Sequence, residues 1–273
     1  HGHEDHIGGI PYLLKELNIP IYGMRFPLGL IENKLKEHNL KASMRVVEAG
    51  ETFRIGKTFR VEALRITHSI ADSMCLSITT PAGRIFHTGD FKIDYTPIDG
   101  KPIDFARLAQ IGSEGVLLMM ADSTNVLRRG YTASERVVGR TLENIFRRSD
   151  RRIIIATFSS NVHRIQKIID LAVICKRKVA ISGRSMVNVV DLAKELGYIK
   201  IPANTLVDLN KTRHIPDKEL VVITTGSQGE PMSALARMAS SDHKSITIKP
   251  GDMVILSSSP VPGNELTVAN VVN

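Results

Sequence analysis

The sequence contains no tryptophan, only two cysteines and few aromatic residues, and it has no long apolar run. Phe and Tyr make up 5% of its 273 residues. No stretch approaches the roughly 18 apolar residues that a membrane-spanning helix needs, and no signal peptide is visible. The shortage of aromatic side chains also argues against base stacking as the main source of affinity for any nucleic-acid partner. We therefore expect a protein that does not contact a membrane.

The two cysteines are too far apart in the sequence to suggest a disulfide framework or a metal-binding pair. Cys75 falls in an apolar predicted strand and Cys175 at the end of a predicted helix. Both are expected to be ordinary buried or half-buried thiols. This usage is typical of the reducing cytoplasm, which is the location that we predict.

Basic residues outnumber acidic ones, 36 Lys and Arg against 28 Asp and Glu, which gives a net charge of +8. The hydrophobic content of 42% and the charged content of 23% are those of a soluble globular protein. The length suffices for one large or two ordinary domains. A positive surface favours a polyanion such as nucleic acid as partner.

Four potential metal ligands fall within the first six positions: His1, His3, Asp5 and His6. In an extended segment His1 and His3 point to the same side, and the glycines at positions 8 and 9 let the chain turn into a helix with Pro11 near its start. Imidazole and carboxylate ligands suit zinc or a similar metal. The alternatives are a polar loop or the remnant of a histidine-rich tag, but a tag rarely continues into Gly-Gly and an amphipathic helix.

Two further candidates lie just past predicted strand ends. His68 follows the strand 59–66, and Asp90 follows a hairpin whose strands, 73–79 and 84–87, turn at Pro81-Ala82-Gly83. Alone, His68 reads as a satisfied polar residue and Asp90 as a turn residue. Together with the first cluster they bring the number of candidate ligands to six. Two metal ions about 3.5–4 Å apart can activate a shared water molecule and clamp the oxygens of a phosphodiester.

The second half alternates regularly between strands, polar loops and helices. Its predicted strands are 153–157, 179–181, 220–224 and 253–256. The alternation predicts a parallel sheet with helices on both faces. Ahead of it, the apolar run 116–121 predicts a buried parallel strand.

Thr132-Ala133-Ser134-Glu135 reads as a capping box for a helix that runs to about Arg148 and buries Val138, Leu142 and Ile145. We place a domain boundary there, between residues 1–131 and 132–273.

Polar residues in the loops after these strands are candidates for contacts with phosphates, because helix starts offer backbone N–H groups. Those that we select are Ser160, Asn161, Arg184, Ser185, Ser227, Gln228 and Ser258. Serine and glycine in such loops can equally be turn chemistry. Clusters of Arg and Lys at 128–129, 147–152 and 176–178 either line an RNA path or form solvated faces.

The spacing H-x-H-x-D-H, followed by His68 and Asp90, resembles the signature of the metallo-β-lactamase superfamily. The resemblance implies that His1, His3 and His68 hold one Zn²⁺, that Asp5 and His6 hold a second, and that Asp90 bridges both. The superfamily completes the second site with a later histidine, which would lie beyond Asn273. We therefore expect an incomplete chain, which also lacks the first strands.

Asp122 in A-D-S-T-N and His163 in S-S-N-V-H-R match the first two motifs of the β-CASP insertion. The amino-acid sequence of these and other stretches resembles that of bacterial ribonuclease J, and the resemblance covers essentially the whole chain. The implied fold is α/β: a partial αββα metallo-β-lactamase core with an inserted parallel β-CASP domain. The implied partners are RNA and a second copy of the chain, as a homodimer or higher oligomer.

The resemblance implies a zinc-dependent ribonuclease, with Mn²⁺ or Mg²⁺ as alternative metals. It would cut RNA as a 5′-to-3′ exonuclease, an endonuclease or both, in RNA maturation and decay. Asp5 and Asp90 would hold a metal-bound hydroxide that attacks phosphorus. Asp122 and His163 would lie beside the metals or contact a phosphate, unless they are a capping Asp and a helix-start His.

Two alternatives stay open. The first is a DNA nuclease or another phosphodiesterase of the same superfamily. The sequence motifs A-D-S-T-N and G-S-Q-G-E-P argue against it. The second is a non-catalytic RNA-binding scaffold. The intact set of six candidate ligands argues against it for the whole protein, and less strongly for a fragment.

Overall fold

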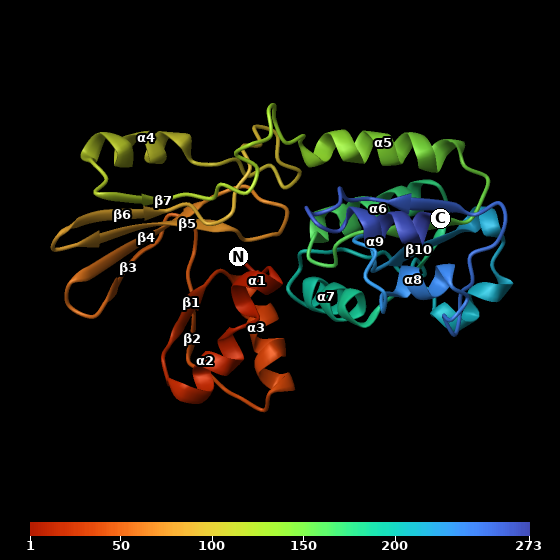
Figure 1. Ribbon diagram of the computed structural model, residues 1–273, viewed down its shortest axis with the longest axis horizontal. Coiled ribbons are helices and arrows are strands. Elements are labelled where there is room, and N and C mark those ends of the chain that lie inside the picture. Colours follow the sequence, from red (N-terminus) through yellow and green to blue (C-terminus); the bar gives the residue numbers. More distant parts are fainter. The chain divides into compact units, whose positions relative to one another are not determined.

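A computed structural model describes all 273 residues, which form two compact units, His1–Val137 and Val138–Asn273 (Figure 1). The division falls within helix α5 (Glu135–Arg148), whose first turn belongs to the first unit. No helix is both long and apolar enough to cross a membrane. Each unit is described by itself.

The first unit contains four helices, a two-stranded parallel sheet and a five-stranded mixed sheet. In chain order its elements are α1 (Glu4–Ile7), α2 (Ile10–Glu16), β1 (Ile21–Gly23), α3 (Arg25–Glu37), β2 (Met44–Val46), β3 (Thr52–Ile55), β4 (Phe59–Arg65), β5 (Met74–Thr80), β6 (Gly83–His87), α4 (Phe105–Glu114) and β7 (Leu118–Met120). Asp104 is the N-cap of α4, since its carboxylate accepts a hydrogen bond from the Arg107 N–H.

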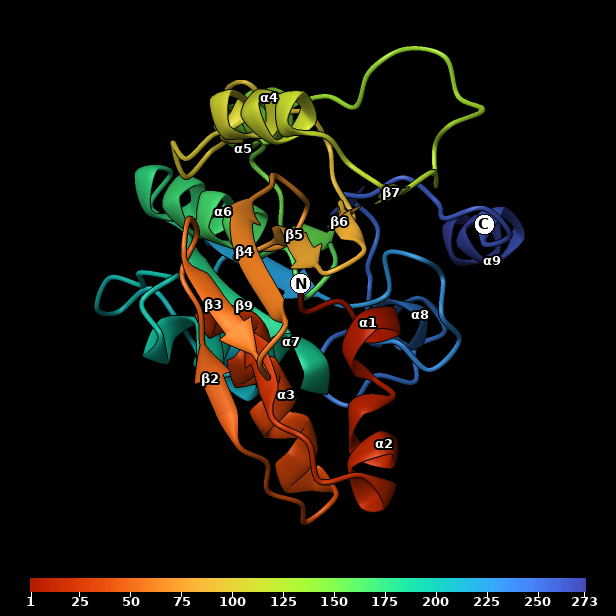
Figure 2. The ribbon, with the colours of Figure 1, turned by 90° about the vertical axis from the view of Figure 1, so that its left-hand side faces the viewer.

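The large sheet has the strand order β3-β4-β5-β6-β7, antiparallel except for the last pair. The hairpin predicted around residues 81–83 joins β5 to β6, with Thr80 opposite Gly83. Figure 2 shows these strands with α1, α2 and α3 gathered beside them. His68 and Asp90 follow the ends of β4 and β6.

Both faces of this sheet carry an apolar cluster, because side chains alternate along each strand. One face packs on α4 through a cluster that consists of Leu64, Ile66, Cys75, Phe86, Ile103 and Ile111. The other face holds a cluster of Val47, Phe53, Val61 and Ala63. Cys75 is fully buried and unpaired, as its sequence context predicts.

The apolar run 116–121 forms a parallel strand, but the prediction that this strand is buried is wrong. Leu118, Met119 and Met120 in β7 are 50%, 62% and 48% exposed. The reason is its place in the sheet: β7 is an edge strand whose only neighbour is β6. An apolar run indicates a strand without saying how much of it other elements cover.

The second unit is the predicted parallel α/β layer. Its elements after α5 are β8 (Ile153–Ala156), α6 (Val162–Ile174), β9 (Lys178–Ser182), α7 (Arg184–Glu195), the 3-10 turns η1 (Leu209–His214) and η2 (Asp217–Glu219), β10 (Leu220–Thr224), α8 (Ala234–Ala239), β11 (Met253–Leu256) and α9 (Glu265–Val272). All four strands are parallel in the order β11-β8-β10-β9. Helices α5 and α6 lie on one side of this sheet and α7 and α8 on the other (Figure 1).

Two details of α5 differ from the prediction. The helix begins at Glu135, whereas a capping box at Thr132–Glu135 would start it two residues earlier, at Ala133. Its buried residues are Gly139, Leu142 and Phe146, whereas Val138 and Ile145 are only partly covered. The face that the helix buries is therefore turned slightly from the one that the sequence pattern suggested.

The stability of the second unit should depend on β8, whose residues are completely buried. Replacing Ile154 by Ala removes side-chain atoms from the central core cluster and should lower the free energy of unfolding by about 2–5 kcal/mol. The matched control is Val254→Ala, because Val254 is the cross-strand neighbour of Ile154 but is 41% exposed. Its cost should stay below about 1 kcal/mol. Equal costs in urea denaturation would contradict this account of the core.

Candidate metal centre

The first four candidate ligands are positioned by an extended segment that turns into a short helix. His3 is extended and occupies the N-cap of α1, so Asp5 and His6 lie in its single helical turn. A Cβ at Gly2 would come within 2.6 Å of Leu30 Cδ1, so a larger residue between the histidines would force the Leu30 side chain to move. The small residue lets the segment lie closely against α3.

The other two candidates come from loops at strand ends. His68 follows β4, and Asp90 follows β6 through Thr88 and Gly89. Gly89 has a φ of +58°, and a Cβ at this position would lie 2.9 Å from the backbone oxygen of Met74. This sharp turn, which favours glycine, directs Asp90 towards the histidines.

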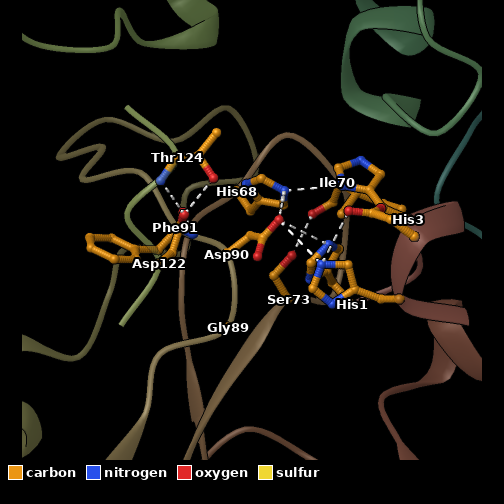
Figure 3. Close-up of polar contacts among 12 residues, drawn as sticks. His1, His3, His68, Ile70, Ser73, Gly89, Asp90, Phe91, Asp122 and Thr124 are labelled. Carbon is orange, nitrogen blue, oxygen red and sulfur yellow. Dashed lines mark hydrogen bonds and ion pairs between the residues drawn. The ribbon is translucent and has the colours of Figure 1, made fainter. Parts of the chain in front are cut away.

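All six candidates converge on one place. Figure 3 shows four of them, His1, His3, His68 and Asp90. An oxygen of the Asp90 carboxylate lies 3.3 Å from His6 Nε2, 3.7 Å from His1 Nε2 and 3.9 Å from His68 Nε2. His68 Nε2 is also 3.1 Å from His3 Nδ1. Two groups of possible ligand atoms result, His1-His3-His68-Asp90 and Asp5-His6-Asp90, and Asp90 is common to both.

The chemistry of this cluster fits a metal ion. The Nε2 atom of His1 is buried without a hydrogen-bond partner, which is costly for a polar atom unless a ligand occupies the site. Burial lowers the pKa of His3, and burial together with the neighbouring His3 lowers the pKa of His68 to about 3. Both imidazoles are therefore neutral at neutral pH, with lone pairs available for coordination.

Asp122 lies next to this cluster and fixes the Asp90 loop. Its carboxylate accepts hydrogen bonds from the Phe91 N–H at 3.4 Å and from the N–H and hydroxyl of Thr124 at 2.9 and 2.7 Å. Burial raises the pKa of Asp122, but these hydrogen bonds outweigh it and hold the pKa below its usual value. Asp122 is therefore a carboxylate that supports the backbone beside Asp90.

Sequence reasoning missed two residues beside the cluster, Lys92 and Glu135. Their side chains form an ion pair at 3.6 Å and are both largely covered. Lys92 belongs to the stretch Thr88–Lys92 that carries the family resemblance, but nothing in the sequence names its partner 43 positions later. The sequence pattern predicts a different role for Glu135, as part of a capping box.

The candidate phosphate-contacting residues of the second unit gather at the carboxyl edge of its parallel sheet, as the alternation predicts. Asn161 caps α6 by accepting a hydrogen bond from the Arg164 N–H, with Ser160 just before it and His163 in the first turn. Arg184 and Ser185 begin α7, where they are exposed.

The Gln228 side chain hydrogen-bonds to the loop that follows β11. Its amide nitrogen donates to Ser258 Oγ and to the Ser259 carbonyl, while its amide oxygen accepts from Val261 N–H and from Asn264. Ser258 in turn donates to the carbonyl of Ser227, and both Ser227 and Gln228 are buried. The side-chain hydrogen-bonding capacity of Gln228 is thus fully used within the protein.

Several of the basic residues considered for an RNA path have structural partners instead. Arg152 pairs with the buried Asp252. Arg177 is buried and donates to the carbonyls of Ser149 and Arg151. These guanidinium groups hold the ends of α5 and β8 in place.

Comparison with known proteins agrees with the geometry of the cluster. The model of the metallo-β-lactamase superfamily matches residues 1–156. The chain belongs to the metallo-β-lactamase superfamily. Membership of this superfamily implies that the protein binds divalent metal. The model described as "Ribonuclease J, beta-CASP domain" matches residues 150–273, so the predicted combination of the two domain types is confirmed.

Several similar curated proteins are named ribonuclease J. The chain is 48% identical to the one from Helicobacter pylori, 47% to that from Synechocystis and 47% to that from Thermus thermophilus. Each comparison covers the whole chain but only 40%, 43% and 49% of the relative. The chain thus spans less than half the length of these relatives, and the resemblance predicted from the motifs is confirmed.

The fold also resembles a crystal structure of a protein of unknown function from Enterococcus faecalis. The match has a TM-score of 0.59 and 15% sequence identity, and it covers 87% of this chain and 65% of that one. At this identity the likeness concerns the fold alone.

Metal binding should depend unequally on Asp90 and His6. Replacing Asp90 by Asn should weaken both binding events by at least about 10-fold, since its carboxylate belongs to both ligand groups. Replacing His6 by Ala should weaken one and leave the other within about 3-fold. Isothermal titration calorimetry of the complete protein with Zn²⁺ or Mn²⁺ measures both. The control is Asp99→Asn, on an exposed loop. An Asp90→Asn variant that titrates like the wild type would refute the shared-carboxylate arrangement.

Proposed function

We propose that this chain is the catalytic part of a metal-dependent ribonuclease that hydrolyses RNA phosphodiester bonds. The observation that carries the proposal is the shared Asp90 carboxylate, which lies within 4 Å of three histidines in a chain that is 48% identical to a ribonuclease J. Two neighbouring ligand groups suit a pair of metal ions, and such pairs are typical of enzymes that cleave phosphodiesters.

In this proposal His1, His3 and His68 would hold one ion and Asp5 and His6 would hold the other, while Asp90 would contribute to both ligand groups. The bound ions would supply positive charge for the phosphate oxygens and would lower the pKa of a water molecule. The part of the chain itself is to place the ligands: Asp90 keeps the two groups together, and Asp122 holds the backbone beside it through the Phe91 N–H.

The phosphate backbone of RNA is the proposed ligand of the carboxyl edge of the parallel sheet. Ser160, Arg184 and Ser185 are the residues that we propose contact it directly, and His163 in the first turn of α6 is a further candidate. Asn161, Ser227, Gln228 and Ser258 would act by shaping the loops, since each hydrogen-bonds within them.

The finer features of the prediction become part of the proposal. We propose Zn²⁺ as the resident metal, since histidine nitrogens dominate the first ligand group, with Mn²⁺ or Mg²⁺ as alternatives. The domains would be residues 1–131 and 132–273. A cytoplasmic location, a role in rRNA processing and mRNA decay, 5′-to-3′ exonuclease or endonuclease activity, and a homodimer or higher oligomer stay predictions.

The decisive experiment uses the complete protein with a 5′-monophosphorylated, 3′-labelled RNA beside a DNA of the same sequence. Wild type should degrade the RNA in a reaction that chelator abolishes. Replacing Asp90 by Ala should slow it by about 100-fold or more, because losing a direct ligand costs more than losing a ligand's partner, which alone costs about 10–100-fold. Asp99→Ala is the matched control.

Three results would change this conclusion. Equal cleavage of the DNA would favour a broader phosphodiesterase. RNA binding without metal-dependent cleavage in the wild type would favour the non-catalytic scaffold. Cleavage that survives the loss of Asp90 would show that the chemistry lies elsewhere in the protein.

A further inference from the structure

The two strand-end loops that carry His68 and Asp90 are joined directly to each other. The Lys92 N–H donates to the Thr67 carbonyl at 2.8 Å, and the Thr67 hydroxyl donates back to the Lys92 carbonyl at 2.5 Å. Thr67 immediately precedes His68, and Lys92 comes two residues after Asp90. This reciprocal pair fixes the spacing between two candidate ligands that are 22 positions apart in the sequence.

The side chain of Lys92 extends this connection to α5. Its ammonium lies 3.6 Å from a carboxylate oxygen of Glu135, and both side chains are only 11% exposed. By comparison, the side chains of the surface pair Lys36–Glu32 are 66% and 52% exposed. An exposed pair is screened by water and contributes little, whereas removing one member of a covered pair leaves an uncompensated charge.

A second contact holds the same helix start. The Ser134 hydroxyl donates to the Thr96 carbonyl at 3.2 Å and lies 3.4 Å from the Thr96 hydroxyl. The segment 92–96 is therefore attached at two points to the residues that begin α5. Helix α5 continues past Val137 into the second unit. Its first turn is therefore attached to the loop that carries Asp90, a candidate metal ligand.

We propose that Lys92 and Glu135 are positioning residues for metal binding and, resting on the proposed function, for RNA cleavage. Their ion pair holds the Lys92 backbone against Thr67, and that pairing sets the distance between His68 and Asp90. Neither residue contacts the reacting atoms. Their effect is to keep the ligands pre-arranged, so that none of the free energy of metal binding is spent on ordering the two loops.

The test compares Glu135→Gln, Lys92→Met and the charge-swapped pair Lys92→Glu with Glu135→Lys in the complete protein. The matched control is Glu143→Gln, which breaks an exposed ion pair with Arg147 on the same helix. Metal affinity is measured by competition with a chromophoric chelator for Zn²⁺ and Mn²⁺, kcat and KM with 5′-monophosphorylated RNA, and folding by thermal denaturation.

Each single variant should bind metal about 10–100-fold more weakly and lose a similar factor in kcat at fixed, subsaturating metal. Its KM for RNA should stay within about 3-fold, because uniform substrate binding is untouched. The swapped pair should recover most of the metal affinity, and Glu143→Gln should match the wild type within about 2-fold.

The inference is overturned if folded Glu135→Gln and Lys92→Met bind metal like the wild type. It is also overturned if a folded swapped pair binds metal no better than the single variants. Should Glu135→Gln fail to fold, Lys92→Met and the swapped pair decide the question by the same criteria. If wild type cleaves no RNA but the single variants still lose metal affinity, the proposed function fails and the positioning role stands.

Discussion

The candidate site of the first unit is organised around one carboxylate that lies among several imidazoles. Asp90 lies within 4 Å of nitrogen atoms from His1, His6 and His68, and the last of these faces a nitrogen of His3 at 3.1 Å. Burial lowers the pKa of His3 and of His68, so these two facing imidazoles are neutral and cannot both donate and accept through every ring nitrogen. A cation shared by their lone pairs resolves this conflict, and the buried, unpartnered Nε2 of His1 marks where it is most acute.

The fold positions these side chains in the same way each time, by placing polar residues just after the end of a strand. His68 and Asp90 stand just after β4 and β6, and in the second unit polar residues stand after each strand of the parallel sheet. Strands that are locked by ladder hydrogen bonds and by buried clusters present their loops with little freedom. Where a loop must turn sharply, as at Gly89 with its φ of +58°, glycine makes the turn without strain.

Much of this arrangement could be predicted because it is local. The hairpin at residues 81–83, the Asp104 cap and the alternation of the second half follow from turn chemistry and periodicity. The resemblance to the metallo-β-lactamase signature selected the six candidates, which converge in the structure. The predictions that failed depend on contacts between residues far apart in the sequence. The apolar run of β7 does not reveal that β7 is a sheet edge, and the spacing from Thr132 to Glu135 does not reveal that Glu135 pairs with Lys92.

The same limit explains why polar residues in functional loops were hard to sort by sequence. Gln228 resembles a substrate-binding residue, yet its amide is saturated by the loop after β11. Lys92 resembles a surface lysine, yet it is covered and lies between a candidate metal ligand and α5. In both, the number and identity of the partners decide the role. A saturated, covered polar group cannot exchange partners without exposing an unpaired one, so it is suited to fix geometry. Groups that meet a substrate must instead keep hydrogen-bonding capacity for it, and the exposure of Arg184 and Ser185 is compatible with the contact that we propose for them.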